Sequence, residues 1–209
     1  MSSTPVLRTA ALTLIAAALC IAIAPAPSQA QYSYSLFDWG QGWSENARPR
    51  VPRMRVVAFP RRIAPGQVIA SFVDRRLYFV HKRGRAIAYP IATPRRRSAW
   101  EGVLRVTKKR TNPPWTPTPS MRRENPHLPA FVPGGHPRNP MGTHALYLGS
   151  TLYRIHGTDA PWTIGQPISK GCIRMLNRHV ADLYSRVPIG TKVTITYRSF
   201  MQQRQGYYW

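Results

Sequence analysis

Two residues of the chain have the types and the spacing for nucleophilic catalysis. Cys172 lies sixteen residues after His156, and the glycines and prolines between them force the segment to turn, so it can bring the two together. A cysteine attacks as the thiolate, and a histidine within hydrogen-bond reach can take its proton, form an ion pair and later protonate a leaving amine. The alternative is a buried thiol beside a histidine that merely ends a strand.

Residues beside the cysteine supply further groups that such chemistry needs. Gly171 lets the backbone pass tightly before Cys172, and N–H groups near these two residues could face a tetrahedral oxyanion. Arg174 could bind a substrate carboxylate through two parallel hydrogen bonds. Ser169 could hydrogen-bond the substrate or only hold the turn, and the sequence leaves both roles open.

Other catalytic classes lack the residues they need. Only 7 of the 209 residues are Asp or Glu, and none are close together, which disfavours paired carboxylates and acidic Ca²⁺ loops. Two cysteines cannot ligate an Fe–S cluster, and no H-E-x-x-H or paired C-x-x-C motif is present, so we expect no metal and no cofactor. Asp159, although close to His156 in sequence, is assigned to a solvent-facing loop rather than to a triad.

Residues 1–30 have the three regions of a cleaved secretory signal. Arg8 precedes an apolar run over residues 9–24, and prolines and small residues follow up to Ala30. A retained anchor, the alternative, would need about 20 apolar residues to span a bilayer. We therefore expect export to the periplasm or cell envelope, with Cys172 as the one cysteine left after cleavage.

The net charge of the chain limits the classes of partner that we expect it to bind. Thirty Lys and Arg against 7 acidic residues give +23, and loss of Arg8 with the signal leaves 29 − 7 = +22. Such a surface could bind nucleic acid through phosphates, but an exported protein rarely meets nucleic acid, so we expect no such partner. Anionic envelope polymers or lipid head groups fit better, and a merely solvated surface is the alternative.

Short runs of β-branched and aromatic residues, separated by turn residues, predict a mostly β fold. The expected strands cover residues 67–73, 77–81, 86–91, 103–108, 144–148, 152–155 and 191–197. A single helix is expected, capped by Asn177 and ended by Pro188. Its apolar positions recur at helical spacing: Val180, Leu183, Tyr184 and Val187.

Residues 112–140 contain too many prolines and glycines for a periodic structure. A loop of this length is usually functional, and Trp115 makes it apolar enough to act as a lid or wall of a groove; a disordered insertion is the alternative. We divide the chain into a signal (1–30), a lead-in (31–65), a main domain (66–198) and a C-terminal tail (199–209).

The segment around the cysteine resembles the signature of the L,D-transpeptidase family, the YkuD-type catalytic domain of bacterial cell-wall enzymes. The family pattern is a His-Gly segment, a spacer, and then Ser-x-Gly-Cys followed by Ile or Val and by Arg or Asn. This chain reads His156-Gly157-Thr158 and then Ser169-Lys170-Gly171-Cys172-Ile173-Arg174-Met175. Two further stretches resemble the family: Asn139-Pro140-Met141-Gly142 and Gly190-Thr191-Lys192-Val193. The similarity spans roughly residues 66–197, and implies a YkuD-like β-sandwich catalytic domain with one short helix and a Pro-rich lid loop.

The resemblance also implies a reaction. Cys172 would be the nucleophile and His156 the base, with the Gly157 carbonyl orienting the imidazole. Such enzymes attack the meso-diaminopimelate carbonyl of a peptidoglycan tetrapeptide stem, release D-alanine and form a thioester. An amine of a second stem, or of a protein such as an outer-membrane protein, then resolves it, and carbapenem-type inhibitors acylate the same cysteine. The family often has histidine where this chain has Lys170, so that histidine's role is not carried over.

Two other functions stay open at this stage. Water could resolve the same thioester, which would make the protein an L,D-carboxypeptidase or endopeptidase, because acceptor choice depends on groove shape and water exclusion. From a different class, a non-catalytic basic protein could bind the envelope, although the presence of both Cys172 and His156 argues against it.

Overall fold

The computed structural model describes residues 53–201, in which strands predominate. The strands are β1 (Arg55–Ala58), β2 (Val68–Ser71), β3 (Arg76–Lys82), β4 (Arg85–Pro94), β5 (Gly102–Thr111), β6 (His144–Leu148), β7 (Arg154–His156), β8 (Pro167–Ser169), β9 (Ile173–Met175) and β10 (Lys192–Thr196). The helices are α1 (Pro119–Glu124) and α2 (Asn177–Arg186), with 3-10 turns η2 (Arg96–Ser98) and η3 (Pro161–Thr163). The predicted signal and tail residues 202–209 lie outside the described residues.

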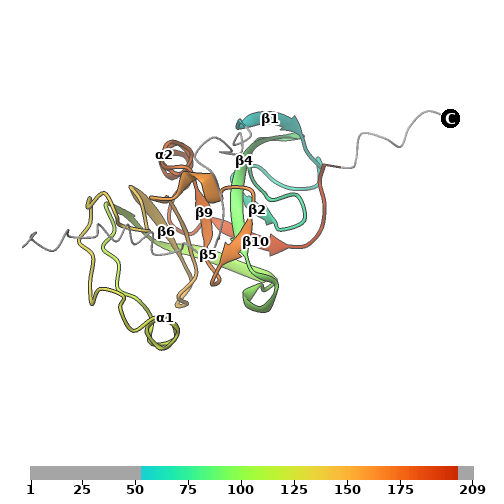
Figure 1. Cartoon of the computed structure of the whole chain (residues 1–209). Helices are drawn as coiled ribbons and strands as arrows, with labels where there is room; N and C mark the ends of the chain where they lie inside the picture. The colour runs from blue at the N-terminus through green and yellow to red at the C-terminus, as the bar shows by residue number, and fades with distance from the viewer. Residues whose placement is uncertain (1–52, 202–209) are drawn as a thin grey trace, which may run out of the picture. The chain divides into compact units, whose positions relative to one another are not determined.

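The strands form two layers because β4 and β5 pass from one into the other (Figure 1). Along residues 85–90, β4 pairs with β3, and along residues 91–94 it pairs with β9 and β8. Likewise β5 pairs first with β10 and then with β6. The hydrogen-bonded order is β1-β4-β3-β2-β10-β5-β6-β7-β9, and the β4–β9 pairing joins its far end back to β4.

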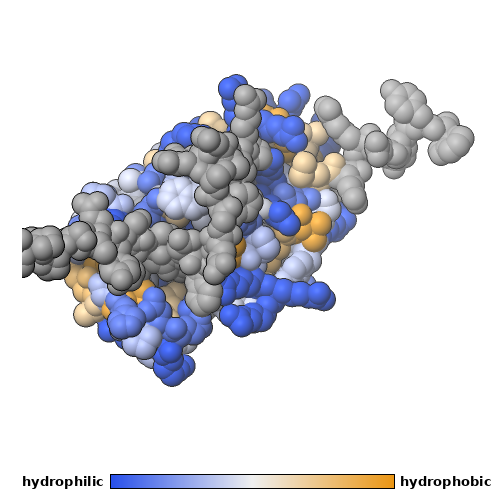
Figure 2. All heavy atoms as spheres, in the orientation of Figure 1, coloured by the Kyte–Doolittle hydropathy of each residue, from blue (hydrophilic) through white to orange (hydrophobic). Residues whose placement is uncertain are grey.

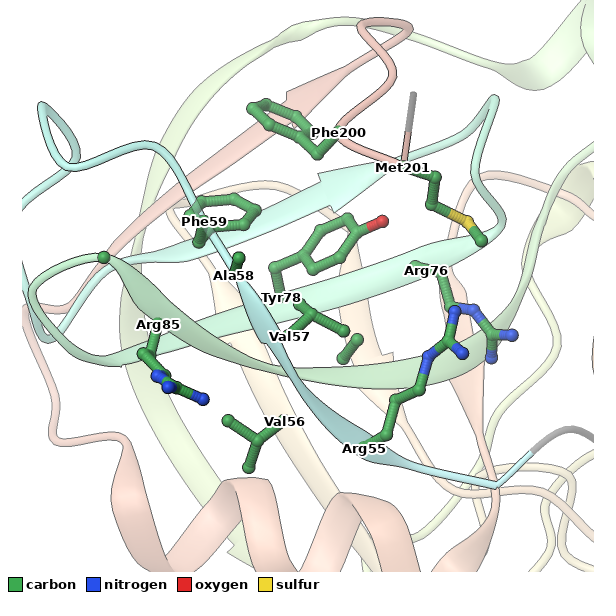
Figure 3. A pocket seen from close by; sticks show the side chains of 12 residues that line it. Arg55, Val56, Val57, Ala58, Phe59, Arg76, Tyr78, Arg85, Phe200 and Met201 are labelled. Carbon is green, nitrogen blue, oxygen red and sulfur yellow. The ribbon is translucent and has the colours of Figure 1, made fainter. Parts of the chain in front are cut away.

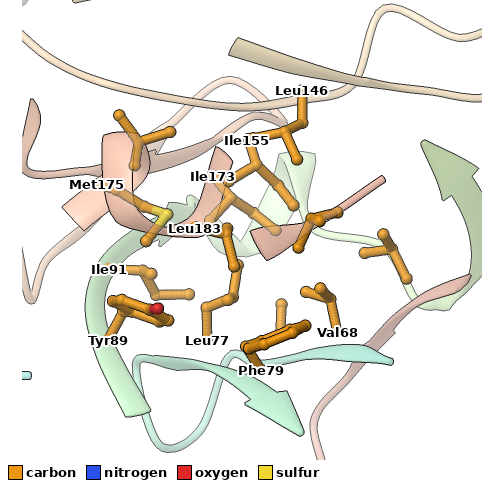
Figure 4. Close-up of a cluster of buried hydrophobic side chains, with 14 of the residues drawn as sticks. Val68, Leu77, Phe79, Tyr89, Ile91, Leu146, Ile155, Ile173, Met175 and Leu183 are labelled. Atoms are coloured by element: carbon orange, nitrogen blue, oxygen red, sulfur yellow. The ribbon is translucent and has the colours of Figure 1, made fainter. Parts of the chain in front are cut away.

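The main hydrophobic core lies between these layers (Figure 4). Leu77 of β3 and Tyr89 of β4 enter it from one side, and Ile155 of β7 and Ile173 of β9 enter it from the other. Helix α2 covers the core with apolar residues at the helical spacing that the sequence predicted. Those side chains are Val180, Leu183 and Val187, the last directly after the helix. Burial of this periodic face holds α2 against the sheet, since so short a helix is marginal alone.

The predicted fold class is confirmed. Each expected strand is present, as β2, β3, β4, β5, β6, β7 and β10. The expectation of one helix was incomplete, because α1 forms within the proline-rich stretch. Pro119 occupies its first turn, where a missing N–H costs nothing, and Thr118 Oγ1 accepts a hydrogen bond from Met121 N at 3.3 Å. The strands not predicted, β1, β8 and β9, have three or four residues each, too few for a period-two pattern.

Structured residues continue beyond the range 66–198 at both ends. β1 lies in the stretch assigned to the lead-in and pairs antiparallel with β4, from Arg55 opposite Ala88 to Ala58 opposite Arg85. Ser199, assigned to the tail, donates from Oγ to Asp74 Oδ1 at 2.5 Å. The described part of the chain therefore packs β1 and the start of the tail against the main domain.

The surface of this domain is rich in basic residues. Hydrophilic side chains cover much of the face that Figure 2 shows outside the grey segments. Arg105, Lys108 and Arg110 are exposed along β5. Within residues 53–201, no helix combines the length and the apolar character that crossing a membrane requires.

Asn139 holds the proline-rich segment in place. Its Nδ2 donates to the carbonyls of Pro113 and Pro133 at 2.9 Å each, and its Oδ1 accepts from Met141 N at 2.8 Å. Trp115 and Val132 exchange backbone hydrogen bonds at 2.9 and 2.8 Å between these anchor points. One buried amide thus satisfies carbonyls at both ends of a segment that has few N–H groups of its own.

Asn139→Ala should therefore destabilise the domain by about 2 kcal/mol, because it leaves buried carbonyls unsatisfied. Urea unfolding measures the loss, and limited proteolysis should show earlier cleavage within residues 112–140. The matched control is Asn125→Ala, since the Asn125 side chain accepts from His127 N in an exposed turn of the same segment. Equal, small losses in both variants would contradict the anchoring role of Asn139.

Candidate active site

The parallel pairing of β7 with β9 brings the predicted histidine and cysteine together. Ile155 lies opposite Ile173, and His156 lies opposite Arg174. Successive side chains of a strand point to opposite faces, so the two isoleucines enter the core. Arg154 and His156 of β7 therefore share the other face with Cys172 and Arg174.

All of these polar side chains line one pocket of about 420 Å³. Its apolar lining comes from the proline-rich segment, from the residue just after it and from the loop before β7: Trp115, Met121, Met141, Leu152 and Tyr153. Trp115 thus lies where a wall of the groove was expected. Within residues 53–201, no group of His, Cys, Asp and Glu side chains is arranged to hold a metal ion.

His156 is oriented by its own chain. The side chain is buried, and its Nδ1 lies 2.6 Å from the Gly157 carbonyl oxygen. A carbonyl can only accept, so Nδ1 carries the hydrogen and the lone pair is on Nε2. This is the hydrogen bond that the family resemblance implied, and it makes Nε2 the atom that can take a proton.

Asn177 fixes the loop that carries this carbonyl. Its Oδ1 accepts from Thr158 N at 3.1 Å and from Thr143 N at 3.2 Å. A Cβ at Gly157 or at Gly142 would collide with this oxygen, so both positions require glycine. The predicted capping role was wrong, because Leu176 is the N-cap of α2 and Asn177 is already helical. Nothing in the local pattern distinguishes the two roles, since the partners are distant in sequence.

The turn before Cys172 is braced by Ser169. Its buried hydroxyl donates to the Cys172 carbonyl and accepts from Gly171 N at 3.4 Å. Gly171 has φ +128°, and a Cβ there would lie 2.9 Å from the Tyr153 ring. Ser169 therefore holds the turn, and the Gly171 N–H is directed at Ser169, which disfavours the oxyanion role expected for it.

Trp100 supports the same turn and was not found by sequence reasoning. Its Nε1 donates to the Gly171 carbonyl at 3.4 Å. Its ring stacks on Tyr153 with centroids 4.2 Å apart. The contact joins residues 71 positions apart, so no local signal could have indicated it.

The thiol of Cys172 is turned toward a backbone carbonyl. Sγ donates to the Leu152 oxygen at 3.6 Å, and no hydrogen bond between Sγ and His156 is present within the described region. Burial raises the pKa of Cys172, against the opposing effects of a hydrogen bond from the Arg154 backbone and the charges of Arg154 and Arg174. Cys172 is thus a neutral thiol near pH 7.

Burial, together with the charges of Arg174 and Arg154, lowers the pKa of His156 to about 3, although its hydrogen bond to Gly157 acts in the opposite direction. The imidazole is therefore neutral near pH 7. The expected cysteine–histidine ion pair is not formed in this state of the protein. The thiol and the imidazole are both neutral, and Arg154 and Arg174 place positive charge beside them.

Arg174 is almost completely buried, with 3% of its surface exposed. Burial lowers its pKa to about 10, and the charges of Cys172 and Asp159 oppose that shift. Asp159 is half-buried, which corrects its assignment to a solvent-facing loop, and burial raises its pKa. It is not the third member of a triad, because the Gly157 carbonyl already holds His156 Nδ1.

Lys170 ties the nucleophile turn to the proline-rich segment. Its Nζ lies 2.7 Å from Oε2 of Glu124, the last residue of α1. The hydrogen bond from Lys170 is the largest cause of the lowered pKa of Glu124. The ion pair therefore links the turn before Cys172 to helix α1, and both segments contribute residues to the pocket.

Comparisons with known proteins agree with the resemblance seen in the sequence. Residues 65–195 match the family model described as the L,D-transpeptidase catalytic domain. The probable L,D-transpeptidase ErfK/SrfK of Escherichia coli K12 is 41% identical over 135 residues, covering 61% of this chain and 43% of that protein. The probable L,D-transpeptidase YbiS of the same strain is 39% identical over 140 residues, covering 64% and 45%. The chain thus spans less than half the length of these relatives.

Among solved structures, the chain is similar to the NMR structure of the catalytic domain of the Enterococcus faecium L,D-transpeptidase acylated by ertapenem. The sequence identity is 17%, and the TM-score is 0.49. The match covers 64% of this chain and 98% of that domain.

The charge of Arg174 should govern the ionisation of Cys172. Because a nearby cation favours the thiolate, Arg174→Gln should move the pH midpoint of iodoacetamide alkylation upward by about one unit. Alkylation at Cys172 is measured by mass spectrometry as the difference from Cys172→Ala. Arg174→Lys, which keeps the charge, is the matched control, and near-ultraviolet circular dichroism checks the fold. An unchanged midpoint in folded Arg174→Gln would show that the guanidinium does not act on the thiol.

Proposed function

The chain belongs to the L,D-transpeptidase family, and we propose that it acylates Cys172 with a peptidoglycan stem peptide and transfers that acyl group to an amine. One observation carries this proposal. The β7–β9 pair places a thiol, an imidazole with its Nε2 unprotonated and two arginines around a single pocket. The relatives named above, which are probable L,D-transpeptidases, support transpeptidation as the reaction class, and we propose the substrate and the acceptor in addition.

The first step joins the thiol to the stem peptide. Cys172 turns from the Leu152 carbonyl toward His156, gives its proton to Nε2, and attacks the meso-diaminopimelate carbonyl of a tetrapeptide stem. The bond to the terminal D-alanine breaks, its nitrogen takes the proton from Nε2, and a thioester forms. The pKa of about 3 belongs to His156 beside a neutral thiol. As the proton moves, the negative charge that forms on Cys172 raises the pKa of His156, so the imidazole can hold the proton.

The two arginines beside the thiol, buried Arg174 and half-buried Arg154, favour this step. Arg174 and Arg154 bring positive charge to the thiolate and to the oxyanion, where the low-dielectric surroundings strengthen the interaction. Arg174 lines the pocket from a buried position, so it would bind a substrate carboxylate only if that carboxylate enters the groove. The Cys172 N–H is the oxyanion donor that we assign.

The second step releases the acyl group and regenerates the free thiol. An amine of a second stem, or of an envelope protein, attacks the thioester, gives its proton to His156 Nε2 and displaces the thiolate, which is reprotonated. The apolar walls formed by Trp115, Met121 and Met141 favour an amine carried by a bound chain over free water. We therefore propose transfer rather than hydrolysis.

This chemistry needs the peptidoglycan side of the inner membrane. We propose that residues 1–30 direct export and are removed after Ala30, because they carry the three regions of a secretory signal. Export also brings the cationic surface to the anionic polymers of the envelope.

Acylation is tested by intact-protein mass spectrometry with a carbapenem such as ertapenem. The wild type should gain one adduct, because the β-lactam carbonyl presents the same target to the thiol. Cys172→Ala should gain none, and His156→Ala should react at least about a hundredfold more slowly, the usual contribution of a general base. His144→Ala is the matched control, since His144 does not line the pocket and its ring meets the Tyr184 ring edge-on.

An adduct that persists in Cys172→Ala would refute the assigned nucleophile. No adduct on the wild type, with the thiol open to general alkylating agents, would instead favour the non-catalytic envelope-binding function.

Transfer and export are tested together in a Gram-negative host that lacks its own L,D-transpeptidases. Expression of the full chain should yield dimeric muropeptides joined through meso-diaminopimelate, or stems attached to protein, and the recovered enzyme should begin at Gln31. Cys172→Ala should yield neither product. Shortened monomeric stems as the only product would show that water is the acceptor and that the protein is an L,D-carboxypeptidase.

A further inference from the structure

A second pocket lies on the outer face of the layer that contains β1, β3 and β4 (Figure 3). Its volume is about 570 Å³, and it shares no lining residue with the pocket of Cys172. Edge strand β1 forms one side, and the start of the tail, at Phe200 and Met201, closes one end. We call it the β1 pocket.

One end of the β1 pocket is aromatic. The Phe200 ring lies 4.9 Å from that of Phe59 and 5.6 Å from that of Tyr78. Asp74 holds this cluster, because its carboxylate accepts from Tyr78 Oη at 2.8 Å, Ser199 Oγ at 2.5 Å and Phe200 N at 2.7 Å. The carboxylate is thus occupied by three donors.

The other end is cationic. Figure 3 shows the guanidinium groups of Arg55 and Arg76 side by side, from β1 and β3. Burial lowers the pKa of Arg76 and the charge of Arg55 lowers it further, while the charges of Tyr78 and Asp74 act in the opposite direction with a smaller effect. Arg76 Nη1 is buried with no hydrogen-bond partner within residues 53–201. The nearby Asp74 carboxylate accepts from its three donors and makes no hydrogen bond to this atom.

This arrangement is unfavourable unless something lies between the two arginines. Two like charges repel, and a buried donor without a partner carries a desolvation cost. A planar guanidinium pair is suited to the oxygens of a carboxylate or phosphate, which would satisfy Nη1 and cancel the repulsion. The aromatic end offers a surface for the rest of the same ligand.

We propose that the β1 pocket binds an anionic ligand, whose carboxylate or phosphate lies between Arg55 and Arg76 and whose apolar or ring portion lies against Phe59, Tyr78 and Phe200. The site is independent of acylation at Cys172. It gives the protein a second point of attachment to oxyanion-bearing molecules, separate from the groove in which the reaction is proposed to occur.

The test is a nuclear magnetic resonance titration of the full chain with phenyl phosphate, benzoate and inorganic phosphate at constant ionic strength. Phenyl phosphate or benzoate should shift the backbone amides of Val57, Tyr78 and Ala88, which line the pocket. Arg55→Gln and Arg76→Gln should each weaken binding about tenfold or more, the usual effect of losing a charged hydrogen bond. Arg110→Gln, an exposed arginine on β5 and the charge-matched control, should change it less than about twofold.

The outcomes separate the ligand sources and the rival explanation. Shifts with phenyl phosphate alone would assign a phosphate ligand, and shifts with benzoate alone would assign a carboxylate ligand. Equal losses in all three variants would mean that only the overall charge attracts anions, and would overturn the proposal, as would the absence of shifts with every probe. Arg55 is exposed on an edge strand, so Arg55→Gln decides the matter even if Arg76→Gln fails to fold.

Discussion

The parallel pairing of β7 with β9 is the constraint on which the site depends. A register in which Ile155 faces Ile173 buries both side chains in the core and turns the alternate residues toward the pocket. Slipping the pairing by one residue would turn His156 into the core and an isoleucine toward the pocket. Packing energy thus sets the position of the chemical groups, and the hydrogen bonds of Ser169, Asn177 and Gly157 then set their orientation.

The price of this arrangement is visible in the ionisation of the same groups. Burial disfavours charge on Cys172, His156 and Arg174 alike. It raises the pKa of the thiol and lowers the pKa of the imidazole and of the guanidinium, and each shift favours the neutral form. The arginine keeps its charge at neutral pH because a pKa of about 10 is still well above 7. In the proposed reaction, this fixed cation lies beside the Cys172 thiolate as it forms, and a preorganised positive charge of this kind stabilises a transient anion.

Whether the role of a residue can be predicted from the sequence depends on where its partners lie. Roles that involve neighbours in the sequence can be predicted, and roles that involve distant segments cannot. Cys172, His156 and Gly157 carry a local motif, so their meeting could be predicted, and so could the longer strands and the apolar face of α2. Trp100, Asn139 and Asn177 act on residues far away in the chain, and their side chains satisfy backbone groups that no pattern identifies in advance. The Asn177 case shows the limit clearly, because an asparagine at a helix start is a good cap on local grounds and was recruited by two loops instead.

The few acidic residues explain how so cationic a chain holds one structure. Asp74 gathers three donors, Glu101 accepts from Tyr197 N at 2.7 Å, and Asp182 binds Tyr89 and Arg186. Glu124 of α1 joins Lys170 in the turn before Cys172. These carboxylates lie at junctions between segments distant in sequence. Because the few carboxylates join segments of the fold, positive charge predominates on this chain, and Arg55 and Arg76 in the β1 pocket are the arginines that we propose to meet an external anion.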